Sequence, residues 1–396
     1  MAMKISTDRI LTTHVGSLPR SPELVDLLEA QNQGKPHDEK ALADLVASSI
    51  KEAVAKQISA GVDVVNDGEL GKVGYTHYVG RRLSGFKVMP AKGRFGGSRG
   101  TVHKDYTDFP DFAARAGATG QISTSYPTPT AAGPIKYVDR GPLEADLRNF
   151  SVAVAGKSPA QTFLSSASPG VLDNHLPNVY YKTDDDYLEA LAEAMREEYL
   201  AIHRAGHVLQ IDCPELASAR ANRYQNESIE SFRKIAARAV EVLNHATRDI
   251  PPDAMRMHVC WGNYEGPHIH DVPFKDVAEV VFQARPAGIL FEGANPRHEH
   301  EWEDWAELKI PDDKILIPGV IDTTTNFVEH PQLVAQRLGK YADIVGKERV
   351  IGGVDCGFSS SGGKNYRVAP SIVWAKLGAL AEGARLATKK LWGGAS

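Results

Sequence analysis

The 396-residue sequence has few cysteines, no long apolar run and almost no excess of charge. There are three cysteines, Cys213, Cys260 and Cys356. This small, odd number argues against a disulfide framework and favours a reducing compartment. No run approaches the roughly 18 apolar residues of a membrane helix, and the first residues contain no apolar signal core. The 45 basic and 50 acidic residues offer no general attraction to nucleic acid or to an anionic membrane. We therefore expect a cytoplasmic protein that binds neither.

The rest of the composition, 42% hydrophobic and 24% charged, is enough for a large globular core. Eight short apolar segments alternate with longer amphipathic ones, which is typical of right-handed βαβ units. The predicted strands span 10–13, 62–65, 160–164, 208–211, 256–260, 288–291, 315–319 and 350–354. The predicted helices span 39–59, 185–205, 228–248, 274–283, 331–341 and 370–390. Eight such units predict an α/β fold, a (β/α)8 TIM barrel, rather than a doubly wound sheet.

One segment, residues 72–157, interrupts this alternation. It is rich in Gly, Pro, Tyr and Thr and is too long for an ordinary loop between a strand and a helix. We interpret it as an insertion after strand 2 in one barrel that spans residues 1–396. A β-hairpin lid and a contact within a homo-oligomer are the two roles we consider for it.

Chemically useful side chains follow the predicted strands, and barrel enzymes place their active sites at the carboxyl ends of strands. His258 and Cys260 are two residues apart on one strand, so both side chains face the same way. The next strand ends in Glu292 and the last one ends in Cys356. One imidazole, two thiolates and a carboxylate suit Zn²⁺. The spacing therefore predicts a zinc site, and buried structural cysteines are the alternative.

A second group of histidines is an alternative metal site without a thiolate; its members are His268, His270, His298 and His300. Two anionic sulfurs and a carboxylate make zinc a poor Lewis acid for water, but they leave it able to bind an incoming thiol and lower its pKa. The thiolate-rich site thus indicates alkyl transfer to sulfur rather than hydrolysis. A purely structural zinc is the alternative, although structural sites usually have closely spaced ligand pairs.

Motifs along most of the chain resemble the zinc-containing catalytic barrel of cobalamin-independent methionine synthase and its short single-barrel relatives. They lie at residues 12–19 (TTHVGSLP), 67–69 (DGE), 210–212 (QID), 258–260 (HVC), 292 (E), 319–322 (GVID) and 355–357 (DCG). The resemblance implies four zinc ligands, namely His258, Cys260, Glu292 and Cys356.

Substrate residues follow from the same resemblance. Ser17 matches the residue that holds the carboxylate of homocysteine, and Glu69 and Asp212 match acids that hold its ammonium group. The implied enzyme is a methyltransferase of methionine biosynthesis in which a zinc-bound thiolate attacks the methyl group. We assign no catalytic residue beyond the zinc site. The partners expected are a small-molecule thiol and an alkyl donor, with a corrinoid protein as one source of the methyl group.

Three positions depart from the family pattern. Cys213 follows Asp212 where the family has Glu, and His175 stands where we expect the Trp that stacks on a pterin. Thr324 stands where the family has a His credited with proton donation. A hydroxyl has no pKa near neutrality and cannot replace imidazole as an acid. The alkyl donor is therefore open among folate, corrinoid, sulfonium and epoxide.

A different function within the same family is that of the epoxyalkane:coenzyme M transferases, which are single-barrel relatives that open an epoxide with a zinc-bound thiolate. A sulfonate would need cations, whereas Glu69 and Asp212 favour an amino-acid thiol such as homocysteine. The candidate cations are Arg20, Lys72, Lys364 and Arg367. The pattern is also compatible with a decarboxylase-like barrel of the uroporphyrinogen type and with a non-enzymatic, zinc-stabilised binding barrel.

Overall fold

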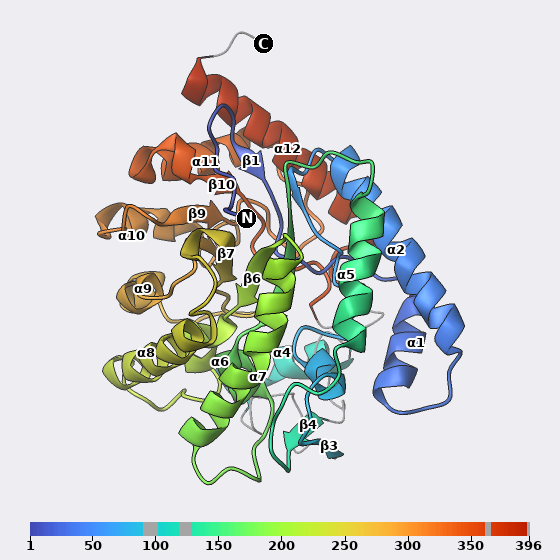
Figure 1. Ribbon diagram of the computed structural model, residues 1–396. Helices are drawn as coiled ribbons and strands as arrows, with labels where there is room; N and C mark the ends of the chain where they lie inside the picture. Colours follow the sequence, from blue (N-terminus) through green and yellow to red (C-terminus); the bar gives the residue numbers. More distant parts are fainter. Residues whose placement is uncertain (90–101, 119–127, 361–365, 394–396) are drawn as a thin grey trace.

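The computed structural model describes residues 1–89, 102–118, 128–360 and 366–393. Eight short parallel strands occupy its centre and helices surround them (Figure 1). The strands are β1 (Leu11–Thr12), β2 (Val64–Val65), β5 (Gln161–Ala167), β6 (Val208–Asp212), β7 (Met255–His258), β8 (Gly288–Phe291), β9 (Ile315–Pro318) and β10 (Ile351–Gly352). Each coincides with one of the eight predicted strands.

The strands close into a barrel in chain order. Six of them form one parallel sheet in the order β2-β5-β6-β7-β8-β9, and β1 pairs with β10. Parallel bridges between Leu316 and Val350 and between Gly319 and Gly353 join β9 to β10. The amide of Asp63 donates to the carbonyl of Thr12 at 3.2 Å and joins β1 to β2. This order confirms the predicted (β/α)8 fold class.

The helices also follow the sequence pattern closely. They are α1 (Pro22–Asn32), α2 (Glu39–Ser59), α5 (Gly141–Val154), α6 (Pro169–His175), α7 (Asp184–Arg204), α8 (Ile229–Ala246), α9 (Phe274–Phe282), α10 (Trp302–Glu307), α11 (Pro331–Val345) and α12 (Pro370–Trp392). Side-chain caps set their first turns: Asp38 accepts from the amide of Ala41, and Thr183 accepts from the amide of Asp186. The six predicted helices are present, whereas α1, α5, α6 and α10 were not predicted. Within the described part of the chain, no helix combines the length and apolar character that a membrane crossing needs.

Residues 72–157 contain both added structure and one barrel helix. The added elements are η1 (His77–Arg81), β3 (Phe86–Met89), α3 (Lys104–Asp108), α4 (Pro110–Ala118) and β4 (Thr128–Ala131), and β3 pairs antiparallel with β4. Helix α5 ends the segment and packs on α2 beside the barrel, as Figure 1 shows. The buried guanidinium of Arg82 attaches the segment to two barrel helices, because it lies 2.5 Å from Asp146 of α5 and 2.8 Å from Glu198 of α7.

A buried arginine, Arg256, connects several strands in the barrel interior, below the carboxyl ends of the strands. Arg256 of β7 donates to Gln210 of β6 at 2.9 Å, to Thr13 at 2.9 Å and to the carbonyl of His14 at 3.0 Å. Its guanidinium lies 3.6 Å from the ring centre of Phe163. Burial lowers the pKa of Arg256 to about 9. These contacts fix the segment that follows β1 against the opposite strands and so position the start of the predicted site.

Candidate active site

Three of the four predicted metal ligands meet at the carboxyl ends of β7 and β10. The ligand atoms of His258, Cys260 and Cys356 are buried and lie within 4.8 Å of one another. The two sulfurs are 3.5 Å apart. Both ring nitrogens of His258 are buried without a hydrogen-bond partner among the described residues. Buried polar groups seldom stay unsatisfied, and one imidazole with two thiols is a soft donor set, so the residues fit a metal ion such as Zn²⁺.

The electrostatics of this cluster favour a thiolate. The interaction with Cys260 holds the pKa of Cys356 well below its usual range, and His258 acts in the same direction. The same contact with Cys356, together with burial, raises the pKa of Cys260. Burial lowers the pKa of His258, but its neighbour Cys356 outweighs burial and the net shift is upward. A negative charge is therefore already stabilised where a metal cation would bind.

Glu292 lies beside this cluster rather than within it. Its two carboxylate oxygens accept hydrogen bonds from the amide of Trp261 and from the side chain of Asn295, each at 2.8 Å. Burial raises the pKa of Glu292, although His298 and His268 act to lower it. The structure thus brings together three predicted ligands, and the role of Glu292 as the fourth stays a prediction.

The alternative histidine group is only partly assembled. His268 and His298 share the carboxylate oxygen Oδ2 of Asp271, at 2.7 and 3.0 Å. Nε2 of His268 also faces a carbonyl, that of Tyr264 at 3.0 Å. Burial lowers the pKa of His268, but Asp271 outweighs burial and the net shift is upward. Burial opposes the charge on His298, but Asp271 raises its pKa to about 10. The ligand atoms of His268, Asp271 and His298 lie within 4.8 Å of one another and could hold a metal ion, so this part of the alternative site stays a prediction. The remaining two members lie elsewhere, His270 against Asp108 and His300 on the surface.

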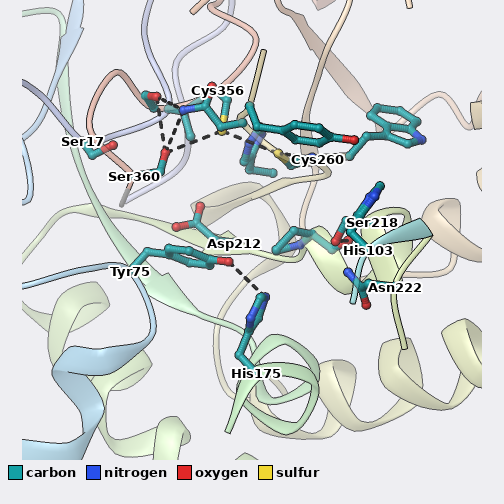
Figure 2. A pocket seen from close by; sticks show the side chains of 18 of the residues that line it. Ser17, Tyr75, His103, His175, Asp212, Ser218, Asn222, Cys260, Cys356 and Ser360 are labelled. Carbon is teal, nitrogen blue, oxygen red and sulfur yellow. Dashed lines mark hydrogen bonds between the residues drawn. The ribbon is translucent and has the colours of Figure 1, made fainter. Parts of the chain in front are cut away.

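A cavity of about 210 Å³ opens onto the thiol cluster and contains all three predicted substrate residues. Figure 2 shows Cys260 and Cys356 on one side, Tyr75 and His175 on the other, and Asp212 between them in this view. The lining residues are Val15, Ser17, Glu69, Tyr75, His103, Tyr106, His175, Asp212, Pro214, Ser218, Asn222, His258, Cys260, Trp261, Gly262, Asn263, Tyr264, Cys356, Gly357 and Ser360. Ser17, Glu69 and Asp212 thus face the same space as the candidate metal ligands.

Strand register and local turns hold the two acids there. Asp212 is paired with His258 across β6 and β7, and its carboxylate accepts from Gln210 at 2.9 Å. Burial and then the nearby charge of Glu69 raise the pKa of Asp212 to about 7. Glu69 has a φ of +57°, a left-handed conformation that is uncommon for a residue with a side chain. Its carboxylate accepts from Ser165 at 2.6 Å. Such an outlier, held by hydrogen bonds, is typical of a functional position.

Ser17 lies close to Glu69, because a Cβ added to the preceding residue, Gly16, would lie 2.5 Å from the Glu69 carboxylate. Its hydroxyl accepts from the amide of Ser359 at 3.3 Å, and its carbonyl accepts from the amide of Phe358 at 2.9 Å. A Cβ added to Gly357 would lie 2.0 Å from the Ser17 hydroxyl, so the backbone approaches this hydroxyl closely. The loop after β10 therefore fixes both Cys356 and Ser17.

The three positions that depart from the family pattern have distinct surroundings. Cys213 is fully buried, its thiol donates to the carbonyl of Ile211 at 3.6 Å, and burial raises its pKa. It is not among the described residues that line the cavity. His175 bonds Tyr75 at 3.1 Å, and burial lowers its pKa to about 4. Thr324 donates to Asp322 at 2.7 Å and lines a neighbouring cavity of about 410 Å³ that also includes Glu292.

No sequence pattern marks the part of the wall that the insertion supplies. His103 and Tyr106 line the cavity from helix α3 and its N-cap. Between them, Asp105 is fully buried and accepts from the Tyr264 hydroxyl at 2.5 Å and from the amide of His268 at 2.6 Å. This carboxylate docks the insertion onto the loop after β7. Only the aromatic content of the segment, without any regular spacing, distinguishes these positions in the sequence.

Two of the candidate cations donate hydrogen bonds to backbone carbonyls. Arg20 donates to the carbonyl of Glu69 at 2.8 Å and to that of Ser359 at 3.0 Å, and Lys72 donates to the carbonyl of Ser165 at 2.5 Å. The charge of Arg367 acts on Tyr106, and burial lowers the pKa of Arg367 itself. Lys364 lies outside the described residues.

The fold and the site define a class: an α/β barrel with a buried thiol and imidazole cluster beside acids at the carboxyl ends of its strands. Residues 10–134 match the model of the catalytic domain of cobalamin-independent synthases. A methionine synthase from Saccharolobus solfataricus is 23% identical over 385 residues, which cover 96% of this chain and 95% of that protein. The uncharacterized protein YxjH of Bacillus subtilis is 24% identical over 376 residues, 92% of this chain and 91% of that protein.

Solved structures agree in fold. A B12-independent methionine synthase from a Shewanella species, in complex with selenomethionine, superposes with a TM-score of 0.69 at 19% identity, covering 97% of this chain and 99% of that chain. A candidate vitamin-B12-independent methionine synthase from Listeria monocytogenes gives 0.64 at 18% identity, covering 95% and 98%. The chain is thus similar along nearly its whole length to proteins named methionine synthase, and over residues 10–134 to the catalytic domain of cobalamin-independent synthases. The predicted resemblance to this family is confirmed.

Proposed function

We propose that this chain is a zinc-dependent methyltransferase that transfers a methyl group to the thiol of homocysteine and produces methionine. One observation carries the proposal: a single cavity joins the cluster of His258, Cys260 and Cys356 to Ser17 and to the acids Glu69 and Asp212. The metal side suits a thiol, and the acids suit an ammonium group. The relatives named methionine synthase support the same reaction.

In this proposal, each side of the cavity holds one group of homocysteine. Glu69 and Asp212 bind the ammonium, and the Ser17 hydroxyl donates to the carboxylate. His258, Cys260 and Cys356 hold Zn²⁺, with Glu292 as the fourth ligand. Zinc bound there lowers the pKa of the incoming thiol, so that a thiolate nucleophile is present at neutral pH. Because Asp212 and His258 are paired across neighbouring strands, the ammonium and the thiol of one small molecule are held in a fixed relation.

The direct test measures zinc content and methionine formation in the same preparations. We expect about one zinc per chain in the wild type, loss of zinc in Cys356→Ser and His258→Ala, and loss of methionine formation with it. Cys213→Ser is the matched control, since this thiol bonds the carbonyl of Ile211 and should leave the zinc content unchanged. A wild-type protein refolded with zinc and still free of metal would refute the proposal.

Coenzyme M provides the test of a different acceptor thiol. Proton release on mixing the zinc-loaded enzyme with homocysteine, but not with coenzyme M, is expected because the acids in the cavity wall would repel a sulfonate. The reverse result would assign the chain to epoxide opening. Unchanged sulfur coordination at the metal with both thiols, measured by X-ray absorption, would favour a structural zinc instead.

A further inference from the structure

We propose that the methyl donor of this enzyme is a small onium cation, a sulfonium or a quaternary ammonium compound, rather than a folate. The inference rests on the proposed transfer to homocysteine and concerns the other half of the same cavity. Tyr75 and His175 lie across the cavity from Cys260 and Cys356 (Figure 2), and the insertion and the loop after β7 supply further wall residues.

The size of the cavity limits the donor. Its volume is about 210 Å³, and homocysteine must occupy part of it. The neighbouring cavity of about 410 Å³ shares Gly262, Asn263, Tyr264 and Cys356 with its wall, but it lacks the acids Glu69 and Asp212. Pockets that enclose drug-sized ligands usually measure roughly 300–1,000 Å³. A pterin with its aminobenzoyl-glutamate tail belongs to that larger class, whereas a methylated sulfonium or ammonium group has only a few heavy atoms. Asp105 attaches the insertion to the loop after β7 through the Tyr264 hydroxyl and the amide of His268.

The wall chemistry selects a cation. Three tyrosine rings, Tyr75, Tyr106 and Tyr264, line the cavity together with the carboxylates of Glu69 and Asp212. Aromatic faces attract quaternary cations through their quadrupole, and nearby carboxylates add to that attraction. The homocysteine ammonium neutralises only one of the two acids, while its own carboxylate adds a negative charge, so the occupied cavity still favours a positive ligand.

An anionic donor lacks a counterpart in this wall. None of the described residues that line the cavity is Lys or Arg. Lys72 lies behind the wall, where its ammonium bonds the carbonyl of Ser165. Arg367 is close enough to interact with Tyr106, Cys356 and Cys260, whose charges act to raise its pKa against burial, but it is not among the described lining residues. The glutamate carboxylates of a folate would therefore enter a space whose described walls present acids.

The proton balance also favours an onium donor. The thiolate sulfur of homocysteine attacks the methyl carbon, the bond from that carbon to the positive heteroatom breaks, and its electron pair returns to the heteroatom. The leaving group is then a neutral sulfide or tertiary amine, and no proton is needed. A folate nitrogen, in contrast, requires an acid that protonates it as it leaves the methyl group. Thr324 cannot act as one, and it bonds Asp322 in the neighbouring cavity.

The experiment compares defined donors on the zinc-loaded full chain with homocysteine. Trimethylsulfonium should yield methionine and dimethyl sulfide, or tetramethylammonium should yield methionine and trimethylamine; the volatile product identifies which onium is used. Methyl iodide, a neutral reagent that needs no recognition, tests the acceptor half alone. Acceleration with methyl iodide but with neither onium ion would overturn the inference and leave the proposed function standing. No acceleration with any donor would refute the proposed function. Efficient transfer from methyltetrahydrofolate would also overturn the inference.

A binding measurement and a matched pair of variants test the recognition itself. Calorimetry on the homocysteine complex should detect choline but not its uncharged carbon isostere, 3,3-dimethylbutan-1-ol; equal binding of the two would contradict cation selection. Tyr75→Leu, which removes the ring, should raise the KM for the onium donor by roughly 2- to 30-fold. Tyr75→Phe, which keeps the ring, should have the KM of the wild type. The rate with methyl iodide should be the same in the two variants. An equal loss with both donors in Tyr75→Leu would indicate a structural role only.

Discussion

In the proposed complex, the raised pKa of Asp212 makes the affinity for the amino-acid substrate depend on pH. Burial and the neighbouring Glu69 raise the pKa of Asp212 to about 7, so this carboxyl group is partly protonated at neutral pH in the free protein. A protonated carboxyl cannot pair with an ammonium ion. Substrate binding should therefore weaken as the pH falls through 7, because a proton must first be removed from Asp212.

The size of the effect follows from the fraction ionised. With a pKa of about 7, roughly nine-tenths of the Asp212 carboxyl groups are charged at pH 8 and roughly a tenth at pH 6. If only the charged form binds the ammonium, Kd rises about tenfold between pH 8 and pH 6, which corresponds to about 1.4 kcal/mol. Burial lowers the pKa of His175, another wall residue, to about 4, so it does not titrate in this interval.

Methionine is the ligand of choice for the assay, since it carries the same ammonium and carboxylate as homocysteine but no thiol proton. Its Kd, measured by calorimetry from pH 6 to pH 8, should change about tenfold with pH in the wild type. In Asp212→Asn, binding should be weak and the Kd should not depend on pH. Asp253→Asn, an isosteric change at an exposed acid, should keep the slope. A flat wild-type profile, or an unchanged slope in Asp212→Asn, would refute the assignment of Asp212 to the ammonium.

Three further changes probe the surroundings of the cavity. Arg82→Met should destabilise the fold by about 3–5 kcal/mol in urea unfolding, because it leaves the buried carboxylate of Glu198 without its cation; a loss below about 1 kcal/mol would count against this. Gly357→Ala should raise the KM for homocysteine with little change in zinc content, since the new methyl would displace the Ser17 hydroxyl; an unchanged KM would argue against Ser17 as a ligand. Burial raises the pKa of Glu215 to about 8, so the folded protein holds this proton more tightly than the unfolded chain and loses stability from about pH 4.5 to pH 8. In Glu215→Gln, the loss of unfolding free energy with rising pH should be smaller by up to about 1.4 kcal/mol per pH unit. The same pH dependence of stability in the wild type and the variant would contradict this prediction.

The barrel was predictable because every strand lies between a turn and an amphipathic helix. Short apolar runs that alternate with amphipathic segments mark the eight strands, and all eight are present. Helix α5 escaped prediction, although it packs on α2 as an ordinary barrel helix, since it follows a Gly- and Pro-rich stretch that resembles one long loop. Helix α6 has only 7 residues, too few for a periodic pattern.

The metal side of the site was predictable for the same reason. Strand period and the order of parallel strands bring His258, Cys260 and Cys356 together from distant parts of the sequence. His14 shows the limit of this reasoning: it stands in the same motif as Ser17, yet it bonds Gln57 at 2.8 Å and packs against Phe163. Whether a side chain after a strand enters the cavity depends on the turn, which the strand pattern does not describe.

The two halves of the cavity are built by different physical means, and this difference bears on how the donor could change. Hydrogen-bonded strand register fixes Asp212 and His258 of the proposed acceptor half, so these two residues cannot move without disturbing the barrel. The donor half comes from the insertion and the loop after β7, which Asp105 joins through Tyr264. Changes in these loops can therefore alter the size and charge of the donor pocket while leaving the cysteines in place. A thiol-activating barrel built in this way can retain its acceptor while its methyl donor is replaced.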